Sequence, residues 1–235
     1  MNRLNILSGG AAQGLVGNLA PAFKARTGFE IAGEFGAVGV MASKLHQGTP
    51  ADIVILTAAI VAALAEAKLV DVASIADVGL VETALAVRAG DPAVTVRDAE
   101  GLRACLLASD AIFVPDIKTS TAGTHVANVL AQLGIADKIA DRLRIFLNGA
   151  TAMRELAASN ARRPIGCTQS TEIISTKGVV LSGPLPTGCE LATMYTAGVT
   201  TQAAHASQAR ELIGLLTGAG QREQRERAGF ISGLK

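Results

Sequence analysis

Aromatic residues are scarce in this 235-residue chain: they make up 3% of it, with one Tyr, six Phe and no Trp. An excess of one charge is also missing, because 21 Lys and Arg residues nearly balance 20 Asp and Glu residues and leave a net charge of +1. Nucleic-acid binding usually needs a basic surface and aromatic side chains for base stacking. The composition therefore argues against a nucleic-acid partner.

Residue clusters that could bind a metal are also lacking. The chain has only three cysteines and three histidines, with no C-x-x-C motif and no pair at metal-ligand spacing. We therefore expect free thiols, no metal site and no cofactor. The scattered residues are Cys105, Cys167, Cys189, His46, His125 and His205.

Long apolar runs are absent: no stretch of 18 apolar residues occurs, which predicts no membrane insertion. The first residues, MNRLNILSGG, enter a strand pattern directly and do not read as a secretory signal. These features favour a cytoplasmic location. The alternative is a periplasmic protein whose signal was removed.

What the chain does have is a core of Ala, Val, Leu and Ile, within 49% hydrophobic residues. Strand and helix patterns alternate, with short Gly- and Pro-containing loops, and this predicts an α/β fold with a mostly parallel sheet. Strands are expected at 4–7, 29–34, 53–56, 80–87, 111–114, 143–146, 164–167, 179–181 and 190–200. Helices are expected at 10–26, 40–47, 58–67, 99–108, 122–133, 150–158, 205–216 and 221–228.

Three strand-to-helix corners carry small polar residues. Ser8-Gly9-Gly10 opens the first helix, residues 120–123 open another, and residues 148–149 open a third. A helix N-terminus offers unpaired N–H groups, and ligands of open α/β sheets bind outside the carboxyl ends of the strands. Each corner alone is compatible with a simple tight turn. Three of them in one chain suggest a shared anion-binding cleft.

The stretch GTPADIVIL, residues 48–56, resembles a signature of type II periplasmic substrate-binding proteins, in particular the molybdate-binding branch. Further stretches follow in the family's order along nearly the whole chain. They are SGGAAQGLVGNLAPAFKARTG, FGAVGVMASKL, PDIKTSTAGTHVANVLAQLG, ATAMRELAAS, RRPIGCTQSTEI and GPLPTGCELATMYTAGV. Aconitate-isomerase-like proteins resemble the same branch.

The resemblance implies two α/β lobes joined by two crossing strands that serve as a hinge, with a ligand cleft between the lobes. The crossings would be residues 80–87 and 190–200. Lobe one would comprise residues 1–81 and 197–235, and lobe two would comprise residues 82–196. Long strands rich in β-branched residues suit a hinge that bends while staying paired.

The resemblance also implies the ligand residues. Ser8 matches the family's first ligand residue, whereas a second family serine is replaced within Ala37-Val38-Gly39, so that only backbone N–H groups remain there. Arg88 is a further candidate because Arg pairs with carboxylates in fork geometry. The full set is Ser8, Gly9, Gly10, Val38, Gly39, Thr57, Arg88, Thr121, Ala122, Gly123, Asn148, Gly149, Thr168 and Gln169.

Two functions remain open for such a site. The first is binding of a small anion, either an organic (poly)carboxylate or an oxyanion of molybdate type, with a membrane transporter as partner if the protein is exported. The second is an isomerase that moves a double bond in a small polycarboxylate, which needs an acid and a base. His125 and Cys167 are the weak candidates for that role, while Asp52 and Asp116 look structural.

Overall fold

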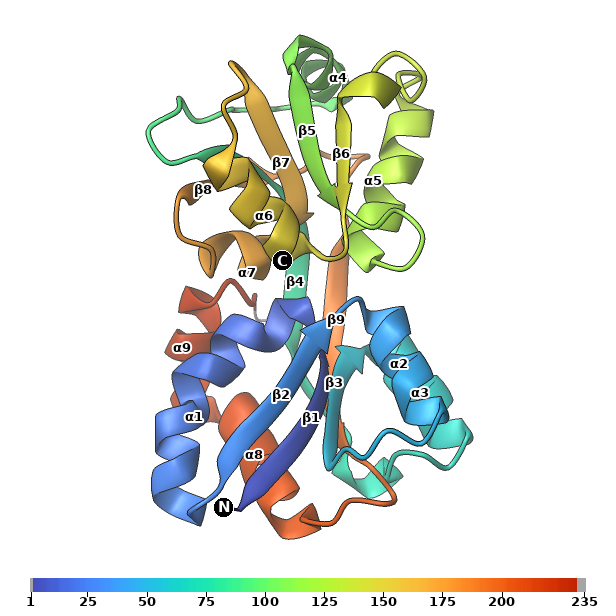
Figure 1. Cartoon of the computed structure of the whole chain (residues 1–235), viewed down its shortest axis with the longest axis vertical. Helices are drawn as coiled ribbons and strands as arrows, with labels where there is room; N and C mark the ends of the chain where they lie inside the picture. The colour runs from blue at the N-terminus through green and yellow to red at the C-terminus, as the bar shows by residue number, and fades with distance from the viewer. Residues whose placement is uncertain (1, 232–235) are drawn as a thin grey trace. The chain divides into compact units, whose positions relative to one another are not determined.

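The computed structural model describes residues 2–231, and the chain divides into two compact units (Figure 1). Unit 1 comprises residues 1–81 and 193–235, and unit 2 comprises residues 82–192. Strands β4 (Ala76–Arg88) and β9 (Ala192–Val199) each run from one unit into the other. The lobes expected from the sequence were residues 1–81 with 197–235, and residues 82–196.

Unit 1 is built on three parallel strands. β1 (Arg3–Gly9) lies between β2 (Glu30–Gly36) and β3 (Ile53–Thr57), and β9 pairs with β3 in the antiparallel direction. The register aligns Ser8 with Phe35 on one side and with Ile55 on the other. All three parallel strands therefore end at the same edge of the sheet, where their helices begin.

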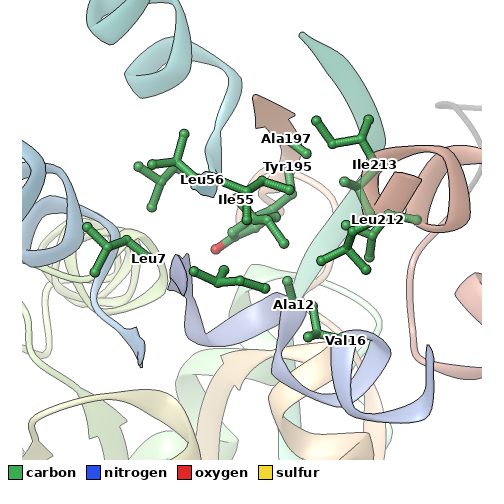
Figure 2. Packing of buried hydrophobic residues seen from close by; sticks show 14 of the residues in the cluster. Leu7, Ala12, Val16, Ile55, Leu56, Tyr195, Ala197, Leu212 and Ile213 are labelled. Atoms are coloured by element: carbon green, nitrogen blue, oxygen red, sulfur yellow. The ribbon is translucent and has the colours of Figure 1, made fainter. Parts of the chain in front are cut away.

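The helices of unit 1 cover this sheet on two sides, with α1 beside α8 and α2 beside α3 (Figure 1). Their bounds are η1 (Gly10–Ala12), α1 (Gln13–Thr27), α2 (Val38–His46), α3 (Ala58–Glu66), α8 (Ala206–Thr217) and α9 (Arg222–Arg227), with short turns η2 (Val72–Ser74) and η4 (Ala219–Gln221). α1 ends at Gly28, whose φ of 74° is the left-handed conformation that glycine adopts most easily. The buried cluster of this unit includes Leu7, Val16, Ile55, Tyr195 and Leu212 (Figure 2).

Unit 2 has a sheet with helices on both faces. β5 (Ala111–Pro115) pairs in parallel with β6 (Leu143–Phe146) and β7 (Pro164–Gln169), while β7 and β8 (Val179–Pro184) each pair with β4 in the antiparallel direction. Alternation along β5 separates two cores. Ile112 and Val114 pack against α4 (Ala99–Ala108) and α5 (Thr121–Gln132), and Phe113 packs against α6 (Gly149–Ala158) and α7 (Ser170–Ile174).

The expected elements are confirmed at all nine strands and at the eight longer helices, with ends displaced by up to four residues. Three-residue helical turns, among them η3 (Ala140–Arg142), were not expected. The sequence analysis also missed α7, which begins directly after β7 and has five residues. Within the described part of the chain, no helix is both long and apolar enough to cross a bilayer.

Candidate functional site

Three helices of unit 1 begin at the carboxyl edge of the β2-β1-β3 sheet without a capping side chain. Their N-cap residues are Gly9 for η1, Ala37 for α2 and Thr57 for α3, and no side-chain cap is formed within residues 2–231. The first N–H groups of a helix have no partner inside that helix. Backbone donors from α2 and α3, including those of Val38 and Gly39, are thus available at this edge.

Ser8 lies in the middle of these helix starts. Its side chain is fully buried, and its Oγ donates to the carbonyl of Gly9 at 2.9 Å rather than capping a helix. The sequence also allowed this corner to be a simple tight turn. In the structure the hydroxyl of Ser8 does not cap the helix that follows it. A bond to the adjacent carbonyl is easily exchanged for a ligand oxygen.

Gly9 is required by close packing at this corner. A Cβ at Gly9 would lie 2.8 Å from Cγ1 of Val38 and 2.9 Å from Cε1 of Tyr195. Tyr195 is buried and pairs with Thr57 in the β3–β9 register, and Figure 2 shows its ring within the cluster that contains Leu7 and Ile55. From the sequence, Tyr195 was expected only to lie on a crossing strand. In the structure its ring lies beside Gly9 and Thr57.

Asp52 has the structural role that was expected for it. Its carboxylate accepts from the N–H of Asn5 at 2.8 Å and from the N–H of His205 at 2.8 Å. The acidic residue of the GTPAD stretch thus joins the start of β1 to the start of α8. It is 1% exposed, so it is not a free carboxylate of the site.

The corner at α5 in unit 2 is capped by its own side chains. Ser120 accepts from the N–H of Gly123 at 3.4 Å, and Asp116 accepts from the backbone of Lys118 and Thr119. A Cβ at Gly123 would lie 2.2 Å from the carbonyl oxygen of Asp116, so Gly123 is needed for packing of the helix on the loop. The donors that remain at this corner are in the first turn, at Thr121 and Ala122.

The corner at α6 is filled by a carboxyl group of the chain itself. Glu172, on α7, accepts from Oγ1 of Thr168 at 2.6 Å, and backbone N–H groups of Gly149 and Ala150 also bond to it. Asn148 caps the helix by accepting from the N–H of Thr151 at 2.9 Å. Asn148, Gly149 and Thr168, which were predicted to bind the ligand, thus use donors or acceptors of this corner for Glu172 and for the helix cap.

Burial governs the acidity of Glu172, which is 6% exposed. Burial raises the pKa of its carboxyl, and the hydrogen bonds from Thr168, Gln169, Ala150 and Gly149 oppose that shift. The sequence carried one signal for this residue: a Glu three positions after the N-cap Gln169 is the spacing of a capping box.

Gln169, the last residue of β7, has an unusual environment. Its side chain is 3% exposed, yet neither Nε2 nor Oε1 has a hydrogen-bond partner within the described residues. The hydroxyls of Thr83 and Thr171, with 1% and 3% exposure, are also buried without partners there. Buried polar groups are normally hydrogen-bonded. The side chains of Gln169, Thr83 and Thr171 are therefore candidates for contact with a ligand.

Arg88 does not join these residues. It ends β4, which is antiparallel to β7, so it lies towards the opposite edge of the unit 2 sheet from Gln169. Its Nε donates to Asp91 at 2.8 Å, and its Nη1 donates to the carbonyl of Ser159. The guanidinium therefore ties the end of β4 to neighbouring loops.

The two weak catalytic candidates are His125, which is hydrogen-bonded, and Cys167, whose thiol is buried. Nε2 of His125 lies 2.8 Å from the carbonyl oxygen of Cys189, with which it forms a hydrogen bond. Burial raises the pKa of the Cys167 thiol to about 12, so this thiol does not supply a nucleophile near neutral pH. No group of three or more potential metal ligands occurs in the part of the chain that the structure describes.

Comparison with known proteins shows a matching family and a distant relative. The chain matches the family described as bacterial extracellular solute-binding protein over residues 4–231. An aconitate isomerase from Pseudomonas sp is 23% identical over 217 residues, which cover 89% of this chain and 80% of that protein.

Solved structures with the same fold include two oxyanion-binding proteins. The periplasmic molybdate-binding protein of Azotobacter vinelandii has a TM-score of 0.80 at 17% identity, covering 98% of this chain and all of that one. A sulfate-binding protein from Mycobacterium tuberculosis has a TM-score of 0.75 at 19% identity, covering 98% and 86%. These likenesses establish a periplasmic-binding-protein fold. With the family match over almost its entire length, the chain belongs to the bacterial extracellular solute-binding proteins.

Proposed function

We propose that this protein binds a small organic anion or oxyanion at the carboxyl edge of the unit 1 sheet. The observation that carries the proposal is the set of helix starts without side-chain caps around the buried Ser8 of unit 1. Free N–H groups at helix N-termini favour negative charge. The hydroxyls of Ser8 and Thr57 add donors at the same edge.

Unit 2, taken by itself, offers a second set of polar groups that have no partner among the described residues and could bind a solute. Gln169, Thr83 and Thr171 offer an amide and two hydroxyls, and the first turn of α5 offers the N–H groups of Thr121 and Ala122. No metal is needed, because backbone and side-chain donors supply the electrostatic stabilisation. We further propose export and delivery of the solute to a membrane transporter, which the family's description as extracellular supports over the cytoplasmic alternative.

Ser8→Ala tests the unit 1 half of the site. We expect the variant to fold normally, because the bond that Oγ makes among the described residues is to the adjacent carbonyl. Its affinity for a bound anion should fall by at least about tenfold, since a hydrogen bond to a charged group contributes about 1.5–3 kcal/mol. Titration calorimetry measures the change, with Ser207→Ala on the exposed side of α8 as control. Unchanged affinity in Ser8→Ala would remove Ser8 from the site.

The second candidate function is isomerisation of an unsaturated polycarboxylate, which the aconitate isomerase relative favours. This reaction needs a base within reach of the substrate. His125 and Cys167 do not fit that role, and Glu172 is buried among donors. Proton NMR of cis-aconitate incubated with the protein separates the two functions: a binder leaves the compound unchanged, and an isomerase converts it to the trans form.

A further inference from the structure

The unpartnered side chains of unit 2 lie on one face of its sheet. Thr83 and Gln169 are directly opposite in the β4–β7 register, and Leu85 pairs with Cys167 two positions further along. Residues two apart on a strand share a face. Leu85 and Cys167 belong to the core that packs against α5, so Thr83 and Gln169 lie on the α5 side of the sheet.

Glu172 lies on the other face. Its partner Thr168 precedes Gln169 and therefore points to the α6 side, where Gly149 closes on the carboxyl group. A Cβ at Gly149 would lie 1.9 Å from Oε2 of Glu172 and 2.2 Å from Oγ1 of Thr168. No room is left at this helix start for a second anion. The negative charge of a solute is thus excluded from one of the two corners of unit 2.

The chemistry of Gln169 then restricts the ligand further. A primary amide presents two N–H donors and an oxygen acceptor. A fully ionised oxyanion or carboxylate has only acceptor oxygens, so it would pair with Nε2 and bring no donor for Oε1. An unsatisfied buried polar atom costs about 1–3 kcal/mol. A hydroxyl or an amide satisfies both sides of Gln169.

We infer that Gln169, with Thr83 beside it, determines specificity by binding an uncharged hydroxyl or amide group of the solute, and that the ligand is therefore a small organic acid with such a group rather than a bare oxyanion or a symmetric dicarboxylate. The inference rests on the proposed function, because it takes the solute to carry an anionic group that Gln169 does not bind.

Four probes of similar length test this inference: butyrate, succinate, succinamate and 4-hydroxybutyrate. Titration calorimetry on the full chain should give affinities for succinamate and 4-hydroxybutyrate about tenfold higher than those for butyrate and succinate. In Gln169→Leu, the affinities for succinamate and 4-hydroxybutyrate should fall to that for butyrate. Gln224→Leu, the same change at an exposed position of α9, should leave the wild-type order unchanged.

Molybdate and sulfate separate failure of the inference from failure of the proposed function. If either of them, or succinate, binds as tightly as succinamate, the protein is an anion binder and the role given to Gln169 is overturned. Retention of the wild-type preference in Gln169→Leu overturns it as well. If none of the six compounds binds at millimolar concentration, both the inference and the proposed function fail. The wild-type series decides the question even if Gln169→Leu does not fold.

Discussion

At the residue scale, the most informative group is Glu172, because it combines deep burial with four hydrogen-bond donors. A carboxyl at the start of a helix resembles the anion that such a start attracts. The protein has supplied this anion from its own chain. Sequence patterns identify a helix start of this kind but do not show whether a ligand or a side chain fills it.

Replacement of Glu172 by Gln should change the pH dependence of stability. Burial raises the folded-state pKa above the ordinary value of 4.5, so the unfolded chain releases this proton first as pH rises. The wild-type carboxyl therefore contributes most to stability below pH 4.5, and the contribution is lost as pH rises towards the folded-state pKa. We expect the stability difference, wild type minus Glu172→Gln, to decrease with rising pH in urea unfolding experiments.

Glu155→Gln is a suitable control, because Glu155 is exposed on α6. Its stability difference from the wild type should stay nearly constant over the same pH range. If the stability difference between wild type and Glu172→Gln is constant or grows with pH, burial does not destabilise the ionised carboxylate of Glu172.

At the element scale, helix starts with and without a side-chain cap can be compared. α4, α5 and α6 of unit 2 are capped by Asp98, Ser120 and Asn148, whereas α2 and α3 of unit 1, and α7 of unit 2, have no side-chain cap among the described residues. Replacing a good N-cap residue by Ala costs about 1 kcal/mol. Unit 1 thus forgoes stability at the edge where we propose that the anion binds.

A matched pair of substitutions at Thr57 tests this interpretation. Thr57 has the extended backbone of an N-cap residue, so both Thr57→Asn and Thr57→Asp should cap α3 and raise the melting temperature. Only Asp adds a negative charge. We expect Thr57→Asp to bind the preferred probe at least about tenfold more weakly than Thr57→Asn, as measured by calorimetry. Equal affinities would contradict an anion site at this edge.

The element scale also shows where sequence patterns were sufficient. Strand and helix periodicity located β1 to β9 and the longer helices, since apolar residues recur at the spacing that each structure requires. α7 was missed because five residues are too few to show a helical period. Because α7 carries Glu172, the bonds of this carboxyl group to Gly149 and Thr168 were not expected from the sequence.

At the scale of the whole molecule, ligand binding should appear as added stability. A ligand that binds only the folded state at about 100 times its Kd adds about 2.7 kcal/mol. For a chain of this size, that corresponds to a rise in melting temperature of roughly 5 to 11 °C. Thermal unfolding with each of the six compounds measures the effect, and Ser8→Ala should show a smaller shift at the same concentration. Equal shifts in both proteins would argue against specific binding through Ser8.

The sequence by itself determined the α/β class, the order of the elements and the family, because these depend on local periodicity and on the order of short motifs along the chain. It also placed Ser8, Thr57 and Gln169 at or near strand ends, where parallel sheets gather their ligand groups. Only the tertiary structure decided which polar groups have partners. Arg88 is paired with Asp91, the α6 corner holds Glu172, and the side chain of Gln169 is buried without a partner among the described residues. Such pairings depend on contacts between distant segments, and no local pattern encodes them.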